Sequence, residues 1–159
     1  MTFTHMPKRE IPEIKQIKVD DVRHYETPDG TFISITSLLS KVLPTPDGII
    51  AWRKNIGNDV ADHIMQKAIE RGKKVHELVE YALKNKPLGD VTNYGVLPFA
   101  LFNMMQPALD KIEQIMALEQ PLYNAELGVA GTADTVCSYD GIPSVVDYKT
   151  ASRIREDVE

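Results

Sequence analysis

The stretch GTADTVCSYDGIPSVVDYKT (131–150) decides how this chain is expected to fold. Runs of alternating apolar and polar residues lie on both sides of Asp140-Gly141, and an Asp-Gly pair in that setting is the strongest short-range signal for a β-hairpin. A two-residue turn there pairs Tyr139 with Ile142, so the numbers of paired residues sum to 281. The rest of the hairpin follows from this register.

The same register brings two acids together. Asp134 and Asp147 also sum to 281, so they lie opposite each other with Cβ atoms about 4.5–5.5 Å apart. Lys149, two residues beyond Asp147, leaves the same face of its strand. Like charges at this spacing destabilise a sheet unless the carboxyls share a proton or hold a divalent cation. Carboxylate oxygens favour Mg²⁺ or Mn²⁺ as that cation.

Simpler interpretations of these residues stay open. Both acids can lie on a solvated face, and Lys149 can form a plain salt bridge with Asp147. A three-residue turn would shift the register by one and separate the acids. The Val-rich strand that leads up to Asp147 argues against the interpretation that both acids are solvated.

Periodicity predicts helices upstream of this hairpin. The longest signal is residues 58–86, where apolar residues recur every three or four positions. Pro107 is expected to kink or split the later helix. The expected elements are a hairpin (25–36), helices (36–43, 49–56, 58–86, 96–119) and strands (121–127, 131–139, 142–150), with a further helix starting at 151–159. This order indicates an α+β or α/β pattern, and of the two we expect an α/β fold with helices on a central mixed sheet.

The composition limits the class of protein. The 159 residues are enough for one domain, expected at 25–159 after an N-terminal arm at 1–24, of which residues 1–16 are expected to be loose. No apolar run is long enough for a transmembrane helix or a secretory signal. A single cysteine, Cys137, excludes a four-cysteine zinc or iron–sulfur site and favours a reducing, cytoplasmic setting. The net charge of −5 argues against a basic nucleic-acid coat protein but is compatible with an enzyme that acts on DNA.

Two motifs of the hairpin match a known family. Gly131 and Asp134 fit a G-x-x-D pattern, and Asp147-Tyr148-Lys149 fits an acid-x-lysine pattern. Together they resemble motifs II and III of the PD-(D/E)XK nuclease superfamily, in its RecB-like exonuclease branch. The resemblance implies a restriction-endonuclease-like α/β fold.

Upstream residues extend this resemblance over most of residues 30–152. Gly72 and His76 in RGKKVHELVE fit the G-x-x-x-H helix of the branch, whose histidine binds a metal. The segment 34–37 is similar to the N-terminal part of phage members, and Glu119 stands where these proteins often carry a glutamate that leads into the sheet. Full members continue into another helix, with a Q-x-x-x-Y motif, and another strand. Both are expected to be missing from this chain, unless a further segment or a partner chain supplies them.

The resemblance implies roles for five residues. His76, Asp134 and Asp147 would bind Mg²⁺ or Mn²⁺ together with the backbone carbonyl of Tyr148. Lys149 would orient the attacking water and stabilise developing negative charge. Each assignment has a plainer alternative, since a lone helical histidine is usually structural and a lysine is usually solvated.

Two further acids are candidates to support the ligands without binding the metal. Glu119 is one, and Glu80 lies one helical turn beyond His76. For both, a solvated surface acid is the alternative.

The function implied by these motifs is metal-dependent hydrolysis of DNA at single strands or ends, with DNA as the partner and no membrane involved. A structure-specific or CRISPR-associated type of nuclease shares the fold, but its iron–sulfur members need four cysteines. An alternative of another class is a nuclease-like DNA-binding or accessory fragment without catalysis.

Overall fold

The computed structural model describes residues 2–7 and 12–150, and the helix expected to start at 151–159 lies outside them. Its sheet is built around β5 (Val129–Tyr139). Along one edge of β5 runs β4 (Ile112–Asn124), paired antiparallel. Along the other edge, β6 (Ile142–Val146) pairs antiparallel with the second half of β5.

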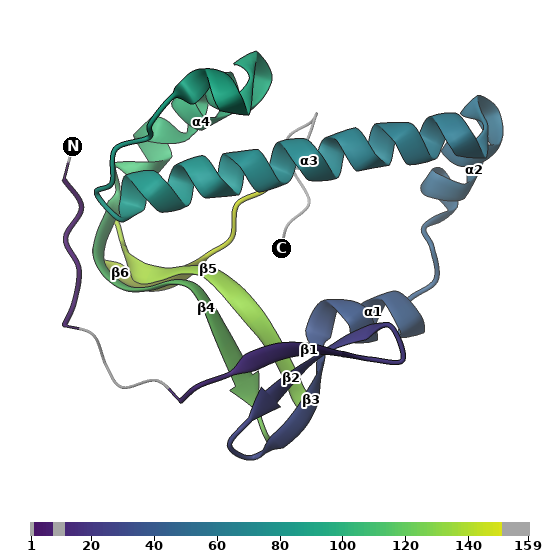
Figure 1. The fold of residues 1–159 in the computed structure, drawn as a ribbon, viewed down its shortest axis with the longest axis horizontal. Coiled ribbons are helices and arrows are strands. Elements are labelled where there is room, and N and C mark those ends of the chain that lie inside the picture. Colours follow the sequence, from purple (N-terminus) through teal and green to yellow (C-terminus); the bar gives the residue numbers. More distant parts are fainter. Residues whose placement is uncertain (1, 8–11, 151–159) are drawn as a thin grey trace.

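A smaller antiparallel unit extends the sheet beyond the first residues of β5. There β3 (Gly30–Ser34) pairs parallel with β5, on the same edge that β6 uses farther along. Next to β3 lies β2 (Val22–Thr27), followed by β1 (Lys15–Val19). The sheet is therefore mixed, and it curls from β1 to β4 (Figure 1).

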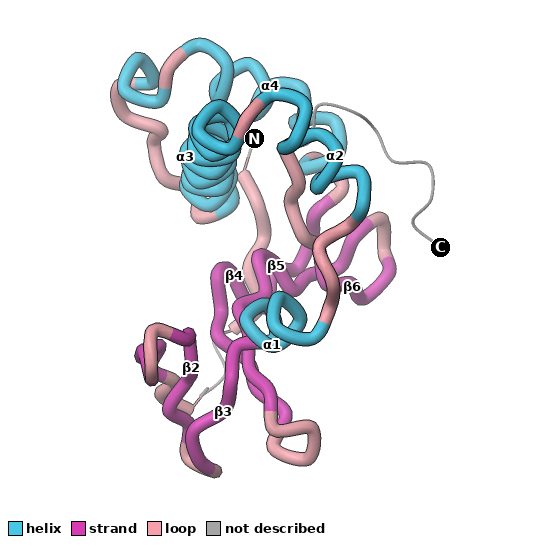
Figure 2. Tube along the Cα trace, turned by 90° about the vertical axis from the view of Figure 1, so that its right-hand side faces the viewer, coloured by secondary structure: helices cyan, strands magenta, loops and turns pink. Residues whose placement is uncertain are grey.

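The described residues form four α-helices and one 3-10 turn. The long helix α3 and the later helix α4 cover one face of the sheet around β4, β5 and β6 (Figures 1 and 2). The described residues therefore form a mixed α/β fold. The bounds are α1 (Ile35–Val42), α2 (Asp47–Ile56), α3 (Asn58–Leu83), η1 (Val91–Tyr94) and α4 (Val96–Leu109).

The core lies between the second half of α3, α4 and the sheet. Val75, Leu78, Val79 and Leu83 of α3 are buried against residues of α4, β4 and β5. The expected apolar stripe of α3 is only partly used, because Ile64 is 46% exposed where the first half of the helix extends beyond the sheet toward α2 (Figure 1). The buried half of α3 is the half that carries the candidate ligand.

The helix expected at 96–119 is too long by about ten residues. The structure ends α4 at Leu109, just after Pro107, and begins β4 at Ile112. A bulge explains the error, because the register of β4 shifts between residues 113 and 117 and Gln114 has a φ of 47°. Ile112 and Ile115 are therefore both buried although they are three residues apart, a spacing that imitates a helix.

Within the N-terminal arm expected at 1–24, the looseness expected for residues 1–16 is contradicted at several described residues. Residues 15–19 form β1, and β2 begins at residue 22. Nearer the start, Phe3 is buried in the core, and the Asn85 side chain accepts from its N–H and donates to its carbonyl. Backbone hydrogen bonds join Thr4 and Met6 to Ile115. These contacts pack residues 3–6 against β4 and the end of α3.

The hairpin register is confirmed. Tyr139 pairs with Ile142, and both turn residues, Asp140 and Gly141, have positive φ, as a two-residue turn of this kind requires. The paired strands end sooner than expected, because β6 stops at Val146 and residues 147–150 are irregular. The two acids therefore fall one step beyond the last pair of the ladder. Among the described residues, no helix is long and apolar enough to cross a membrane.

Candidate metal centre

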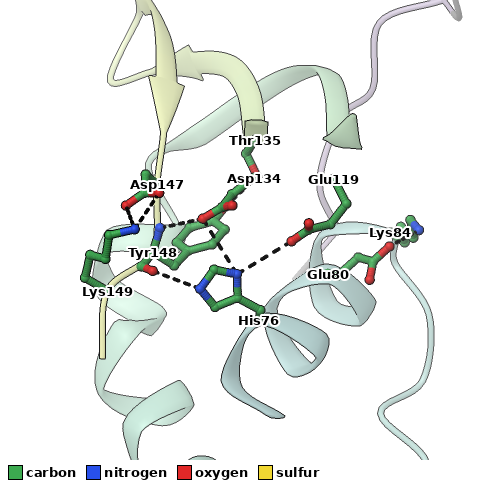
Figure 3. Close-up of polar contacts among 9 residues, drawn as sticks. All are labelled: His76, Glu80, Lys84, Glu119, Asp134, Thr135, Asp147, Tyr148 and Lys149. Carbon is green, nitrogen blue, oxygen red and sulfur yellow. Dashed lines mark hydrogen bonds and ion pairs between the residues drawn. The ribbon is translucent and has the colours of Figure 1, made fainter. Parts of the chain in front are cut away.

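Three side chains from three different elements converge between α3 and the sheet. His76 comes from α3, Glu119 from β4 and Asp134 from β5 (Figure 3). Each offers one ligand atom, and these atoms lie within 4.8 Å of one another. His76 Nδ1 is 3.6 Å from Glu119 Oε1 and 3.7 Å from Asp134 Oδ2. All three are half-buried, a setting in which two carboxylates and an imidazole suit a divalent cation.

The sheet register explains why Glu119 meets Asp134. Leu118 pairs with Thr135 and Gln120 with Ala133, so Glu119 falls opposite Asp134 between these pairs. Its φ of 46° is unusual for a residue other than glycine and marks an irregularity in β4. Like charges opposite each other are costly in a sheet. Here the pair faces His76 of α3, so an imidazole or a cation can offset the repulsion.

His76 is held in one orientation by the chain that follows β6. Its Nε2 lies 2.8 Å from the carbonyl oxygen of Tyr148. The two rings meet edge-on, with their centroids 5.7 Å apart. A carbonyl only accepts, so Nε2 carries the proton. In the neutral ring, Nδ1 is then the nitrogen with a free lone pair, and it faces the two carboxylates.

Tyr148 links the ligands through its backbone. Its N–H donates to Asp134 Oδ2 at 2.8 Å, while its carbonyl accepts from His76. Its phenol is buried and lies 2.6 Å from the Thr135 hydroxyl, and burial raises the pKa of Tyr148 well above its ordinary value. The expectation that this carbonyl is a metal ligand stays a prediction, because in this structure it accepts a hydrogen bond from His76.

Asp147 and Lys149 lie apart from the His76 cluster. Lys149 Nζ is 2.6 Å from an Asp147 carboxylate oxygen, and both side chains are more than half exposed. Figure 3 shows this pair on the side of Tyr148 away from Glu119. The contact is the salt bridge that the sequence left open as the alternative role of Lys149. The metal and catalytic roles of the two residues stay predictions.

The segment after β6 runs along α3. Tyr148 contacts His76, the Thr150 carbonyl lies 3.4 Å from Arg71 Nη2, and a Cβ added at Gly72 would be 3.5 Å from the Thr150 hydroxyl. The missing side chain of Gly72 thus faces the protein's own chain. An alanine there would meet only an ordinary van der Waals contact.

An open hollow of about 500 Å³ borders the cluster. Glu80 lines it next to Glu119 and forms an ion pair with Lys84. Burial, and then the neighbouring Asp134 carboxylate, raise the pKa of Glu119 above its ordinary value, while His76 opposes the shift. Glu80 is thus neutralised by Lys84. Glu119 is itself one of the candidate ligands, although the sequence suggested only that it supports them.

Sequence reasoning identified His76 and Asp134 and missed how directly Glu119 joins them. The signal that finds Glu119 is the pairing of β4 with β5, which was hidden because residues 112–119 look helical. No family model matches this chain, and no curated protein matches it significantly. The chemistry of the cluster must therefore be argued from its own geometry.

Proposed function

We propose that this protein is a Mg²⁺- or Mn²⁺-dependent deoxyribonuclease that hydrolyses phosphodiester bonds at single strands or DNA ends. The proposal includes a restriction-endonuclease-like fold of the RecB-like exonuclease type. The observation that carries it is the convergence of His76 and Asp134, which come from separate motifs 58 residues apart. His76 Nδ1 lies 3.7 Å from the Asp134 carboxylate, beside the second carboxylate of Glu119, an arrangement that suits the ligands of one divalent cation.

The donor set fits the proposed metal. Carboxylate oxygens suit Mg²⁺ and Mn²⁺, and the imidazole nitrogen of His76 favours Mn²⁺ further. The cluster opens onto the hollow beside α3, so a strand of DNA has an approach to it. A bound divalent cation supplies Lewis acidity toward phosphate oxygens and lowers the pKa of water.

The chain's own residues supply the remaining functions. Lys149 is a compact, flexible cation paired with Asp147, on the side of Tyr148 away from Glu119 (Figure 3). Released from Asp147, its ammonium would hold the attacking water and stabilise charge that develops on the phosphate. Lys73 lines the hollow beside Glu77, Glu80 and Glu119, and it would be the residue there that contacts a phosphate backbone.

A nuclease assay with a matched control tests the proposal. Labelled single-stranded and duplex DNA are incubated with the purified chain in Mn²⁺, in Mg²⁺ and in EDTA. Asp134→Asn should reduce cleavage at least about 100-fold, because it removes a charged ligand. Asp140→Asn, the same change in the exposed turn of the same hairpin, should stay within about twofold of the wild type. Cleavage that persists in EDTA or in Asp134→Asn would refute the proposal.

A second candidate function is a nuclease-like DNA-binding or accessory protein without catalysis. The observation in its favour is the ion pair between Asp147 and Lys149, which occupies both residues away from the cluster. DNA that binds in Ca²⁺, measured by fluorescence anisotropy, but is never cleaved in Mn²⁺ would support this candidate over the first.

A further inference from the structure

We propose that the cation binds on the Nδ1 side of His76, with Glu119 as its third protein ligand, and that Asp147 is not needed to hold it. The inference rests on the proposed function for the choice of Mg²⁺ or Mn²⁺. It goes further because it names the coordinating nitrogen and replaces one expected ligand by another.

The first step is the orientation of the imidazole. A histidine that binds a metal through one ring nitrogen almost always donates its other N–H to a carbonyl or carboxylate. His76 Nε2 already has such an acceptor, the Tyr148 carbonyl at 2.8 Å. The nitrogen left for a cation is therefore Nδ1.

The second step is the spacing of the three donors. Nδ1 lies 3.6 Å from Glu119 Oε1 and 3.7 Å from Asp134 Oδ2. Both distances are too long for hydrogen bonds, although a protonated imidazole at this range would form an ion pair with either carboxylate. Two ligand atoms about 2.1 Å from one ion lie roughly 3 to 4 Å apart, depending on the bond angle. The observed separations fall inside that range.

The third step is the place of Glu119 in the sheet. It lies opposite Asp134 on the neighbouring strand, between the observed pairs that join residues 118 and 120 to β5. Two half-buried carboxylates held side by side repel each other unless a positive charge lies between them. Among the described residues, His76 is the only basic side chain within ion-pair distance of either carboxylate, and no lysine or arginine joins it.

The fourth step is the environment of Asp147. Its carboxylate already has a cationic partner, Lys149, with N–O distances of 2.6 and 2.8 Å. It is exposed, and the backbone of Tyr148 lies between it and His76 (Figure 3). Asp147 is thus placed to meet substrate or water from outside rather than to complete the cluster.

Manganese binding tests the inference without any DNA. The electron paramagnetic resonance signal of free Mn²⁺ is followed as wild-type and variant proteins are titrated. Glu119→Gln should weaken Mn²⁺ binding at least about tenfold, because it removes a charged ligand. Asp147→Asn and Glu80→Gln, the second a matched change on the wall of the same hollow, should stay within about threefold. Circular dichroism at the assay temperature confirms that each variant is folded.

Several results would overturn the inference. One is a Glu119→Gln variant that binds Mn²⁺ as tightly as the wild type. Another is an Asp147→Asn variant that loses as much Mn²⁺ affinity as Glu119→Gln. A wild-type chain that binds no Mn²⁺ overturns it as well. Should a variant fail to fold, long-range ¹H–¹⁵N spectra of the wild type decide the matter. Mg²⁺ should shift Nδ1 of His76 and leave the proton on Nε2, and the reverse pattern contradicts the inference.

The outcomes also separate this inference from the proposed function. Glu119-dependent Mn²⁺ binding in a chain that cleaves no DNA would remove the nuclease function and leave the metal site. Metal-dependent cleavage in a chain whose Mn²⁺ affinity is unaffected by Glu119→Gln would do the opposite.

Discussion

The two flanks of β5 place an acid beside Asp134 in two different ways. On the β4 side, Glu119 is half-buried, faces Asp134 and His76, and has a raised pKa. On the β6 side, Asp147 follows the last paired residue, lies exposed and forms an ion pair with Lys149. Each acid occupies the position opposite Asp134 in the register of its own strand with β5. The difference lies in where each side chain lies relative to α3.

The position of each side chain relative to α3 accounts for this difference, because Glu119 faces His76 of that helix and Asp147 lies beyond the Tyr148 backbone from it (Figure 3). The helix lies over β4 and β5, so polar groups there must find partners inside the protein. Beyond Val146 the chain leaves the sheet, and the side chain of Asp147 can be solvated. The strand register thus brings both acids next to Asp134, but only the acid that faces His76 of α3 joins the candidate metal site.

The largest effect is expected at Lys149 on the exposed flank. Lys149→Met should reduce DNA cleavage about 100-fold or more, because the cation that stabilises developing charge is lost. Mn²⁺ affinity should change less than about threefold, since Lys149 is not part of the cluster. Lys111→Met, which removes an exposed lysine paired with Asp140, is the control and should leave both measurements unchanged. Cleavage that survives Lys149→Met would remove its catalytic role.

Next in size is the stability difference between the flanks. Ile115 in β4 is 2% exposed, while Val145 in β6 is 69% exposed. Ile115→Ala should lower the free energy of unfolding by about 2–4 kcal/mol, through lost burial and a cavity. Val145→Ala should stay within about 0.5 kcal/mol. Urea unfolding measures both, and equal losses would show that the β6 flank is covered in solution.

A smaller effect follows from the raised pKa of Glu119. A carboxyl whose pKa is higher in the folded protein stabilises the fold at low pH, and that stability is lost as pH rises through the raised pKa. Without metal, Glu119→Gln should therefore raise the melting temperature by roughly 1–4 °C at pH 7, the effect of one like-charge pair. The gain should vanish near pH 4.

The control for this change is Glu126→Gln, in the exposed loop between β4 and β5. It should leave the melting temperature unchanged at both pH values. A Glu119→Gln variant that is less stable than the wild type at pH 7, in the absence of metal, would contradict the repulsion between Glu119 and Asp134.

Parts of this picture were predictable from sequence for identifiable physical reasons. The Asp140-Gly141 turn fixed the register of β5 and β6 because a two-residue turn allows only one pairing. The long helix followed from a regular apolar period, and His76 followed from the G-x-x-x-H pattern of the family resemblance. The strand β4 could not be predicted from this period, because its bulge sets the buried Ile112 and Ile115 at helical spacing.

The candidate site was predictable only in part for a related reason. Asp134 lies within a paired strand, so its direction follows from the register. Asp147 lies one residue beyond β6, where its direction depends on contacts of Tyr148 with Asp134 and His76. Those contacts join residues far apart in sequence, and no local pattern contains them.

The most direct test is the position of the metal. Crystals of the protein grown with Mn²⁺ would give an anomalous peak at the manganese absorption edge. We predict one peak bounded by His76 Nδ1, Glu119 and Asp134, with the Tyr148 carbonyl still hydrogen-bonded to His76 Nε2. A peak between Asp134, Asp147 and the Tyr148 carbonyl, or no peak near His76, would contradict it.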